Sequence, residues 1–278
     1  MNHFDLGGDG EPLHFLHANG YPPECYSPLF EHLQKKYRVF GMKLRPLWDG
    51  ASREGLKDWH PYSDDFLEFL SNRASEPVIG VGHSIGGVVT LRAAMKAPEK
   101  FRALVLLDPV LIVPPFMAAW NLVRAIGLGE RTHPLISAAK KRRRVFDDLD
   151  LVFERYRERE IFRYMNDESL KFYIKGITKP KVDGGYELVY SPEWEVHIYL
   201  TGLRDFDLWR NLPRFEAPTL IIRGAETDTF SENAEKLIKK KNPGVRVVTM
   251  QKATHLLPLE HPHEVAQIID NFVRPERI

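Results

Sequence analysis

The chain has 278 residues and a formal net charge of +1, and 43% of its residues are hydrophobic against 28% that are charged. This composition is that of a globular protein and gives no reason to expect nucleic acid or a strongly acidic surface as a partner. Cys25 is the single cysteine, which excludes an internal disulfide framework and favours a reducing compartment, expected to be the cytoplasm. No uninterrupted apolar stretch is long enough to span a bilayer, and residues 1–5 lack the features of a signal peptide.

Predicted strands and helices alternate along much of the chain. Residues 1–11 are polar and glycine-rich and indicate a hairpin or an irregular lead-in. Further on, apolar runs predict strands, and apolar residues at helical spacing predict helices, one of them with Ser63 as its N-cap. In chain order, the expected strands are 13–16, 38–44, 77–81, 101–107, 219–223 and 245–250. The expected helices are 27–36, 63–73, 231–241 and 262–272, with a further helix-like run after Ser84. Such alternation is typical of an α/β protein with a mostly parallel central sheet flanked by helices.

The alternation breaks between residues 110 and 212. This segment is helix-rich, carries charged patches and contains no convincing buried strand. A structureless loop of about a hundred residues inside a compact domain would be improbable. We therefore expect one α/β core, formed by residues 1–109 and 213–278, that is interrupted by a helical subdomain at residues 110–212.

A G-x-S-x-G motif spans Gly82 to Gly86 and lies between an apolar run and a helix-like run. This layout is what a nucleophile elbow requires, with the central Ser84 at the tip of a sharp strand-to-helix turn. The residues two before and two after such a serine come so close that only very small side chains fit. The alternative is a glycine turn without chemistry. His83 adjoins Ser84, but neighbouring side chains diverge at a sharp turn, so we interpret His83 as a packing residue.

A serine hydroxyl is a poor nucleophile unless a base takes its proton, so the motif predicts an acid and then a histidine on later loops. Asp228 follows the strand predicted at 219–223, and His255 follows the strand predicted at 245–250. Both lie at carboxyl ends of strands, where open α/β sheets place their sites. We therefore predict a catalytic triad of Ser84, Asp228 and His255.

Two other carboxylates compete with Asp228. Glu226 lies in the same loop, and Asp108 follows the strand at 101–107, from where an acid could also reach His255. The structural alternative for Asp108 is a hydrogen-bonding residue beside Pro109 that closes the strand end. The sequence favours Asp228 and keeps Asp108 as the possible alternative acid.

Acyl transfer also needs backbone N–H groups aimed at the developing oxyanion. One donor should be Ile85, directly after the proposed nucleophile and at a helix start. The other should come from the loop His17-Ala18-Asn19-Gly20, where the expected donor is the N–H of Asn19.

With these motifs the chain resembles the α/β-hydrolase fold superfamily, in particular its capped branch of esterases, lactonases and C–C hydrolases. The resemblance covers nearly the whole chain and is carried by HANG at 17–20, GHSIGG at 82–87, RGAETD at 223–228 and ATHLLPLEHP at 253–262. It implies that residues 110–212 form a helical cap domain over the active site. Ala18 stands where the family usually has glycine. The serine nucleophile separates this chain from the haloalkane dehalogenases and epoxide hydrolases of the same fold, which use aspartate.

Other polar clusters carry weaker signals. Four histidines could be imagined as zinc ligands, but no H-E-x-x-H motif or paired cysteine spacing supports a metal, and we expect none. They are His14, His17, His261 and His263. The basic run Lys140–Arg144 is interpreted as a solvated helix face of the cap, with a role toward anionic substrates or membranes as the alternative.

The sequence therefore predicts a cofactor-independent serine esterase that acts on small to medium, hydrophobic carboxylic esters through an acyl-enzyme. A C–C bond hydrolase or a lactonase with the same triad is the first alternative. A binding or signalling module that captures a small ligand without turnover is the second. The expected partner is a small-molecule substrate, with no nucleic acid and no membrane span. The sequence does not indicate which oligomeric state the protein has.

Overall fold

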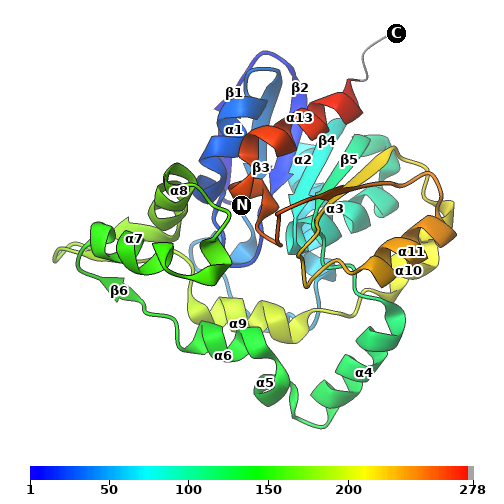
Figure 1. Ribbon diagram of the computed structural model, residues 1–278. Helices are drawn as coiled ribbons and strands as arrows, with labels where there is room; N and C mark the ends of the chain where they lie inside the picture. The colour runs from blue at the N-terminus through cyan, green and yellow to red at the C-terminus, as the bar shows by residue number, and fades with distance from the viewer. Residues whose placement is uncertain (275–278) are drawn as a thin grey trace.

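The computed structural model describes residues 1–274, and a seven-stranded sheet forms its centre (Figure 1). The strands follow the order β1-β3-β2-β4-β5-β9-β10, in which β1 is antiparallel to β3 and every other pair is parallel. Their bounds are β1 (His3–Gly7), β2 (Glu11–Leu16), β3 (Tyr37–Met42), β4 (Val78–His83), β5 (Phe101–Leu107), β9 (Thr219–Gly224) and β10 (Arg246–Met250). The predicted α/β class and mostly parallel sheet are confirmed.

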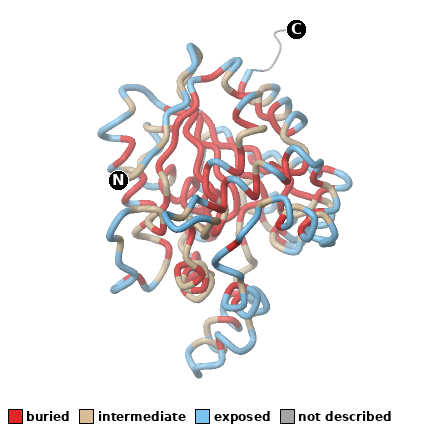
Figure 2. Tube along the Cα trace, turned by 90° about the vertical axis from the view of Figure 1, so that its left-hand side faces the viewer, coloured by how far each residue is buried: buried red, intermediate tan, exposed pale blue. Residues whose placement is uncertain are grey.

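The central strands are buried on both faces, because their side chains alternate between two hydrophobic clusters. Leu104 and Leu106 of β5 belong to one cluster, whereas Val105 and Leu107 belong to the other. The first cluster lies under α2 (His60–Arg73), α3 (Ile85–Lys96) and α11 (Glu232–Lys241). The second lies under α1 (Ser27–Leu33), α13 (Pro262–Val273) and the short α12 (Leu257–Glu260). Figure 2 shows that buried residues concentrate in the sheet.

The segment between β5 and β9 is called the insertion, and it lies along one end of the sheet (Figure 1). Its helices are α4 (Pro114–Ala125), α5 (Gly129–Thr132), α6 (Pro134–Lys140), α7 (Leu149–Arg157), α8 (Asp167–Ile177), α9 (Pro192–Thr201) and α10 (Phe206–Asn211). Three short strands, β6 (Val145–Phe146), β7 (Thr178–Pro180) and β8 (Tyr186–Leu188), form a small antiparallel sheet that the sequence did not predict. Strands of two or three residues are too short to leave an alternating pattern.

Five short 3₁₀ helices complete the elements assigned in the described residues. They are η1 (Pro23–Tyr26), η2 (Arg45–Leu47), η3 (Pro98–Lys100), η4 (Glu160–Phe162) and η5 (Leu212–Arg214). Within residues 1–274, none of the helices combines the length and the hydropathy needed to cross a membrane.

Two local predictions need correction. Residues 3–7 do not form a hairpin with the next strand, because β1 crosses to the far side of β3 and pairs there. Ser63 does not cap α2, which begins three residues earlier at His60 with Pro61 in its first turn, a position that proline favours. Ser231, in contrast, does cap α11, since its hydroxyl accepts a hydrogen bond from the N–H of Ala234.

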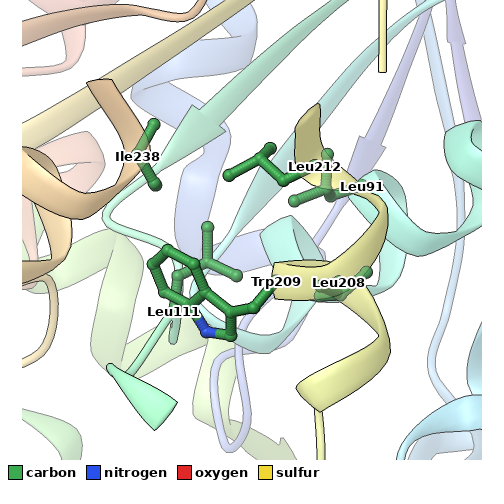
Figure 3. Close-up of a pocket in the computed structure, with 6 residues that line it drawn as sticks. All are labelled: Leu91, Leu111, Leu208, Trp209, Leu212 and Ile238. Carbon is green, nitrogen blue, oxygen red and sulfur yellow. The ribbon is translucent and has the colours of Figure 1, made fainter. Parts of the chain in front are cut away.

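The two ends of the insertion meet beside the core. The indole N–H of Trp209, near the return end, donates to the carbonyl of Ile112, near the exit, at 2.9 Å. Figure 3 shows a small apolar void at this junction, with a volume of about 10 Å³. It is lined by Leu91, Leu111, Leu208, Trp209, Leu212 and Ile238. A void of this size and apolar lining has no room for a ligand, so the junction is a packing contact.

Candidate active site

Ser84 lies at the turn between β4 and α3 with φ 59° and ψ −120°, a conformation that L-residues rarely adopt. The turn needs its two glycines. A Cβ atom on Gly82 would overlap the carbonyl of Gly86, and a Cβ atom on Gly86 would overlap the carbonyl of Leu16. The backbone therefore has the sharp strand-to-helix turn that the motif predicts, and it lifts the Ser84 side chain off the end of the sheet.

His255 follows β10, and its ring lies beside Ser84 at the carboxyl ends of the strands. Its Nε2 lies 3.0 Å from Ser84 Oγ, and its Nδ1 lies 2.6 Å from Asp108 Oδ2. Because a carboxylate accepts hydrogen bonds, Nδ1 carries the proton, and Nε2 is left to accept from the serine hydroxyl. Asp108 is fully buried, whereas the His255 side chain is 24% exposed.

The predicted contact between Asp228 and His255 is wrong, because Asp228 is exposed and its carboxylate accepts from the neighbouring Thr229 hydroxyl. Strand pairing explains why Asp108 takes this place. Strands β4 and β5 are neighbours, with His83 opposite Leu107, so the residues that follow them lie side by side. Asp108, with φ 40°, then turns its side chain toward His255.

The loop after β9 supports Asp108 instead of replacing it. Its Thr227 hydroxyl donates to Asp108 Oδ2 at 2.5 Å, and the N–H of Gly224 lies 3.4 Å from Asp108 Oδ1. Glu226, the other competitor, accepts from the Tyr164 hydroxyl and from Arg163, and both of these residues belong to the insertion. Thr227 was missed by the sequence reasoning, since a threonine directly before the expected acid Asp228 carries no distinguishing signal.

Glu260 braces the loop that carries His255. Its carboxylate accepts from both the N–H and the hydroxyl of Thr254, at 2.8 and 2.6 Å. Burial raises the pKa of Glu260, and the two hydrogen bonds from Thr254 oppose that shift. The residue before the proposed base is thus held by a buried side chain six residues further along the chain, another contact that the sequence did not predict.

The loop His17–Gly20 lies beside Ser84, because β2 pairs with β4 and Leu16 is opposite Gly82. Ile85 is the first residue of α3, so its N–H has no acceptor within the helix. Asn19 is buried, and its side chain makes two hydrogen bonds to the insertion. Its Nδ2 donates to the carbonyl of Glu195 at 3.1 Å, and its Oδ1 accepts from the Tyr190 hydroxyl at 2.9 Å.

The histidines considered as metal ligands have other partners. His14 Nε2 accepts from the N–H of Met42, and His17 Nε2 accepts from the N–H of Leu44, each at 3.0 Å. Burial lowers the pKa of His14 to about 3 and that of His17 to about 4, so both rings are neutral at neutral pH. Residues 1–274 contain no group of three or more side chains placed to hold a metal ion.

The residues of the basic run Lys140–Arg144 are exposed except for Arg142, as predicted, but the run is not a helix face, because α6 ends at Lys140. Arg142 is largely buried, and its guanidinium pairs with Glu195 at 2.8 Å. The other pairs are Lys140 with Glu130, Arg143 with Asp147, and Arg144 with Glu193. The run therefore ties parts of the insertion together.

Comparisons with known proteins agree with this architecture. A family model described as "Alpha/beta hydrolase family" matches residues 15–268. An (E)-2-((N-methylformamido)methylene)succinate hydrolase of Acinetobacter baylyi is 20% identical, with 98% of this chain and 93% of the relative covered. A pimeloyl-[acyl-carrier protein] methyl ester esterase of Aliivibrio salmonicida is 23% identical, with 97% and 94% covered. The solved structure of an E-2-(acetamidomethylene)succinate hydrolase has a TM-score of 0.77 at 21% identity, covering 98% of this chain and 94% of that one, and this likeness shows the fold.

Proposed function

Because the chain belongs to the alpha/beta hydrolase family, we propose that it is a serine hydrolase that cleaves carboxylic ester bonds of small to medium, hydrophobic substrates. One observation carries the proposal: Ser84, His255 and Asp108 form a continuous hydrogen-bonded chain with distances of 3.0 and 2.6 Å. Nucleophile, base and orienting acid in this arrangement are the components that acyl transfer requires.

In the proposed reaction, Ser84 attacks the ester carbonyl while His255 Nε2 takes the hydroxyl proton. Asp108 holds His255 in the required tautomer and stabilises the imidazolium that forms. His255 then gives the proton to the departing alcohol, which leaves an acyl-enzyme on Ser84. Water, deprotonated by the same histidine, releases the carboxylic acid and restores the serine.

The N–H groups of Ile85 and Asn19 are the proposed oxyanion hole. Ile85 supports this role because its N–H lies at the start of α3, where donors are free and the helix dipole favours negative charge. Asn19 supports it because its loop packs against the elbow and its side chain is fixed at both ends of the amide.

Residues 110–212 are proposed to form a cap over this site. The support is that Tyr190 and Glu195 of the insertion bind Asn19 directly, and that Ser84 is only 6% exposed. A cap of this kind would define the pocket for the acyl or alkyl group. A cytoplasmic location stays a prediction from the single cysteine.

Hydrolysis of short p-nitrophenyl esters tests the proposal. We expect wild-type protein to hydrolyse them and to react covalently with a fluorophosphonate at Ser84, and we expect Ser84→Ala to lose at least about 1,000-fold in kcat. Ser71→Ala, which removes an exposed hydroxyl on α2, is the matched control and should behave as wild type. Equal rates for wild type and Ser84→Ala would refute the assignment.

A panel that adds lactones and C–C substrates to the esters separates the two enzymatic alternatives, which share the triad. Stoichiometric binding of a small ligand without turnover would instead favour a binding or signalling module on the hydrolase fold.

A further inference from the structure

His83 is the last residue of β4 and directly precedes Ser84, and its ring lies in the core, where it packs against the His255 ring with the two centroids 5.0 Å apart. The side chain is fully buried, and both ring nitrogens have partners. Nδ1 lies 2.7 Å from the Tyr26 hydroxyl, and Nε2 lies 2.8 Å from the backbone carbonyl of His255. The ring therefore contacts the main chain of the proposed base.

The direction of each hydrogen bond follows from these partners. A carbonyl oxygen only accepts, so His83 Nε2 carries the proton and donates to His255. Burial holds the pKa of His83 well below its usual value, so the ring is neutral and Nδ1 is an acceptor. The Tyr26 hydroxyl consequently donates to Nδ1, and its oxygen accepts from the N–H of Ala18 at 3.1 Å.

The result is one directed chain that runs from the N–H of Ala18, through Tyr26 and His83, to the carbonyl of His255. Its two ends are backbone groups of the two loops that flank Ser84. Ala18 adjoins Asn19, a proposed oxyanion donor, and His255 is the proposed base. A buried backbone donor and acceptor each need a partner, and here two side chains satisfy both while fixing the distance between the loops.

We propose that His83 and Tyr26 are positioning residues that hold the main chain of His255 and the loop containing Asn19 in register with Ser84. This inference rests on the proposed function and adds two residues that touch neither substrate nor reacting atoms. Its physical basis is that acyl transfer tolerates displacements of only about 0.5 Å in its catalytic groups. Loss of these hydrogen bonds should therefore lower turnover before it affects substrate binding.

Kinetics of Tyr26→Phe, His83→Leu and His83→Gln test the proposal. Tyr26→Phe keeps the ring but removes the hydroxyl, and His83→Leu removes both ring nitrogens. We expect each to lower kcat about 10- to 100-fold, with KM within about twofold of wild type. His83→Gln is the conservative control, because its amide offers one acceptor and one donor, and it should recover most of kcat.

Titration with a fluorophosphonate counts the competent sites, so kcat is expressed per reactive serine and unfolded protein does not contribute. If wild type is active and Tyr26→Phe and His83→Leu match its kcat per site, the positioning role is refuted. If wild type neither turns over esters nor labels, the hydrolase proposal itself fails.

A second measurement needs no turnover. Amide hydrogen exchange at Ala18 should be at least about tenfold faster in Tyr26→Phe than in wild type, because the N–H loses the Tyr26 hydroxyl as its acceptor. Nitrogen chemical shifts of the His83 ring should show a neutral ring with the proton on Nε2. Unchanged exchange at Ala18, or a proton on Nδ1, would overturn the proposed chain whatever the activity.

Discussion

At the scale of single residues, Ser84 combines the proposed nucleophile with a backbone conformation that normally belongs to glycine. A non-glycine residue held in such a region costs about 1–3 kcal/mol, which the surrounding fold must offset. The strain is the means by which the side chain is presented above the end of β4. It follows that the position is optimised for chemistry at the expense of stability.

This strain predicts a difference between two inactive variants. Ser84→Gly removes the Cβ atom and relieves the strain, whereas Ser84→Ala keeps it. After the entropy that glycine loses on folding, Ser84→Gly should still be about 1 kcal/mol more stable than Ser84→Ala in urea unfolding. A Ser84→Gly variant that is less stable than Ser84→Ala by about 0.5–1 kcal/mol, the entropy cost of glycine alone, would show that the turn is unstrained.

The sequence favoured Asp228 as the acid of the proposed triad, whereas in the structure Asp108 contacts His255. A pair of matched variants distinguishes the two candidates. Asp108→Asn should lower kcat about 10,000-fold, because the amide favours the wrong tautomer of His255. Asp228→Asn changes an exposed carboxylate and should stay near the wild-type rate. The reverse result in the p-nitrophenyl ester assay would return the role to Asp228.

At the scale of elements, the sequence predicted the strands and helices that carry the site but not which loops would meet. Apolar runs mark β4, β5, β9 and β10 clearly, so the carboxyl ends of these strands, where the site lies, could be located from residue patterns. The choice between Asp108 and Asp228 depends on the backbone of each loop, which leaves no periodic signal. Contacts such as that between Asn19 and Tyr190 join residues 171 positions apart and could not be read from one sequence.

The contact between the insertion and the loop after β2 predicts that Tyr190 influences catalysis without touching the triad. Tyr190→Phe removes the hydrogen bond to Asn19 Oδ1 and frees the proposed oxyanion loop. We expect kcat/KM to fall about tenfold, since one hydrogen bond that positions a group is worth about 1.4 kcal/mol here. Tyr186→Phe on β8 removes an equivalent hydroxyl away from that loop and should leave the rate unchanged, so equal losses in both variants would contradict the idea.

Helix α3 also anchors the return end of the insertion through a buried charge. Arg92 is 1% exposed and pairs with Asp205, which is 4% exposed, and with Asp207. Burial raises the pKa of Asp205, and Arg92 opposes that rise. Because removing one partner leaves an uncompensated buried charge, Arg92→Leu should cost about 3–5 kcal/mol of unfolding free energy.

The control for this prediction lies one turn further along the same helix. Lys96 pairs with Asp64 at 2.6 Å, and both side chains are exposed. Lys96→Ala should cost less than about 1 kcal/mol, as exposed ion pairs contribute little. Comparable losses for the two variants in denaturant unfolding would mean that burial of the Arg92 cluster does not matter.

At the scale of the whole molecule, the buried neutral histidines make the free energy of unfolding depend on pH. His14 and His17 have pKa values of about 3 and about 4 in the folded protein against 6.5 for the free side chain. Below pH 6.5 the unfolded chain therefore binds more protons than the folded one, and stability falls as the pH decreases. The loss levels off only below the folded pKa values.

Each of these rings should cost about 3 kcal/mol of unfolding free energy between pH 7 and pH 4. His17→Gln cannot titrate, while its amide oxygen can still accept from the N–H of Leu44. The variant should therefore lose less stability over that interval, as measured by urea unfolding at a series of pH values. A pH dependence as steep as that of wild type would exclude His17 as a source.

The adjacency of β4 and β5 has an evolutionary consequence. Ser84 and Asp108 both precede the insertion, so an exchange of residues 110–212 by recombination would leave their spacing intact. The loop after β9 contributes the Thr227 hydroxyl to Asp108, whereas the Asp228 carboxylate binds its neighbour Thr229. An exchanged insertion would have to restore the hydrogen bond from Tyr190 to Asn19 and the buried pairs that Asp205 and Asp207 make with Arg92.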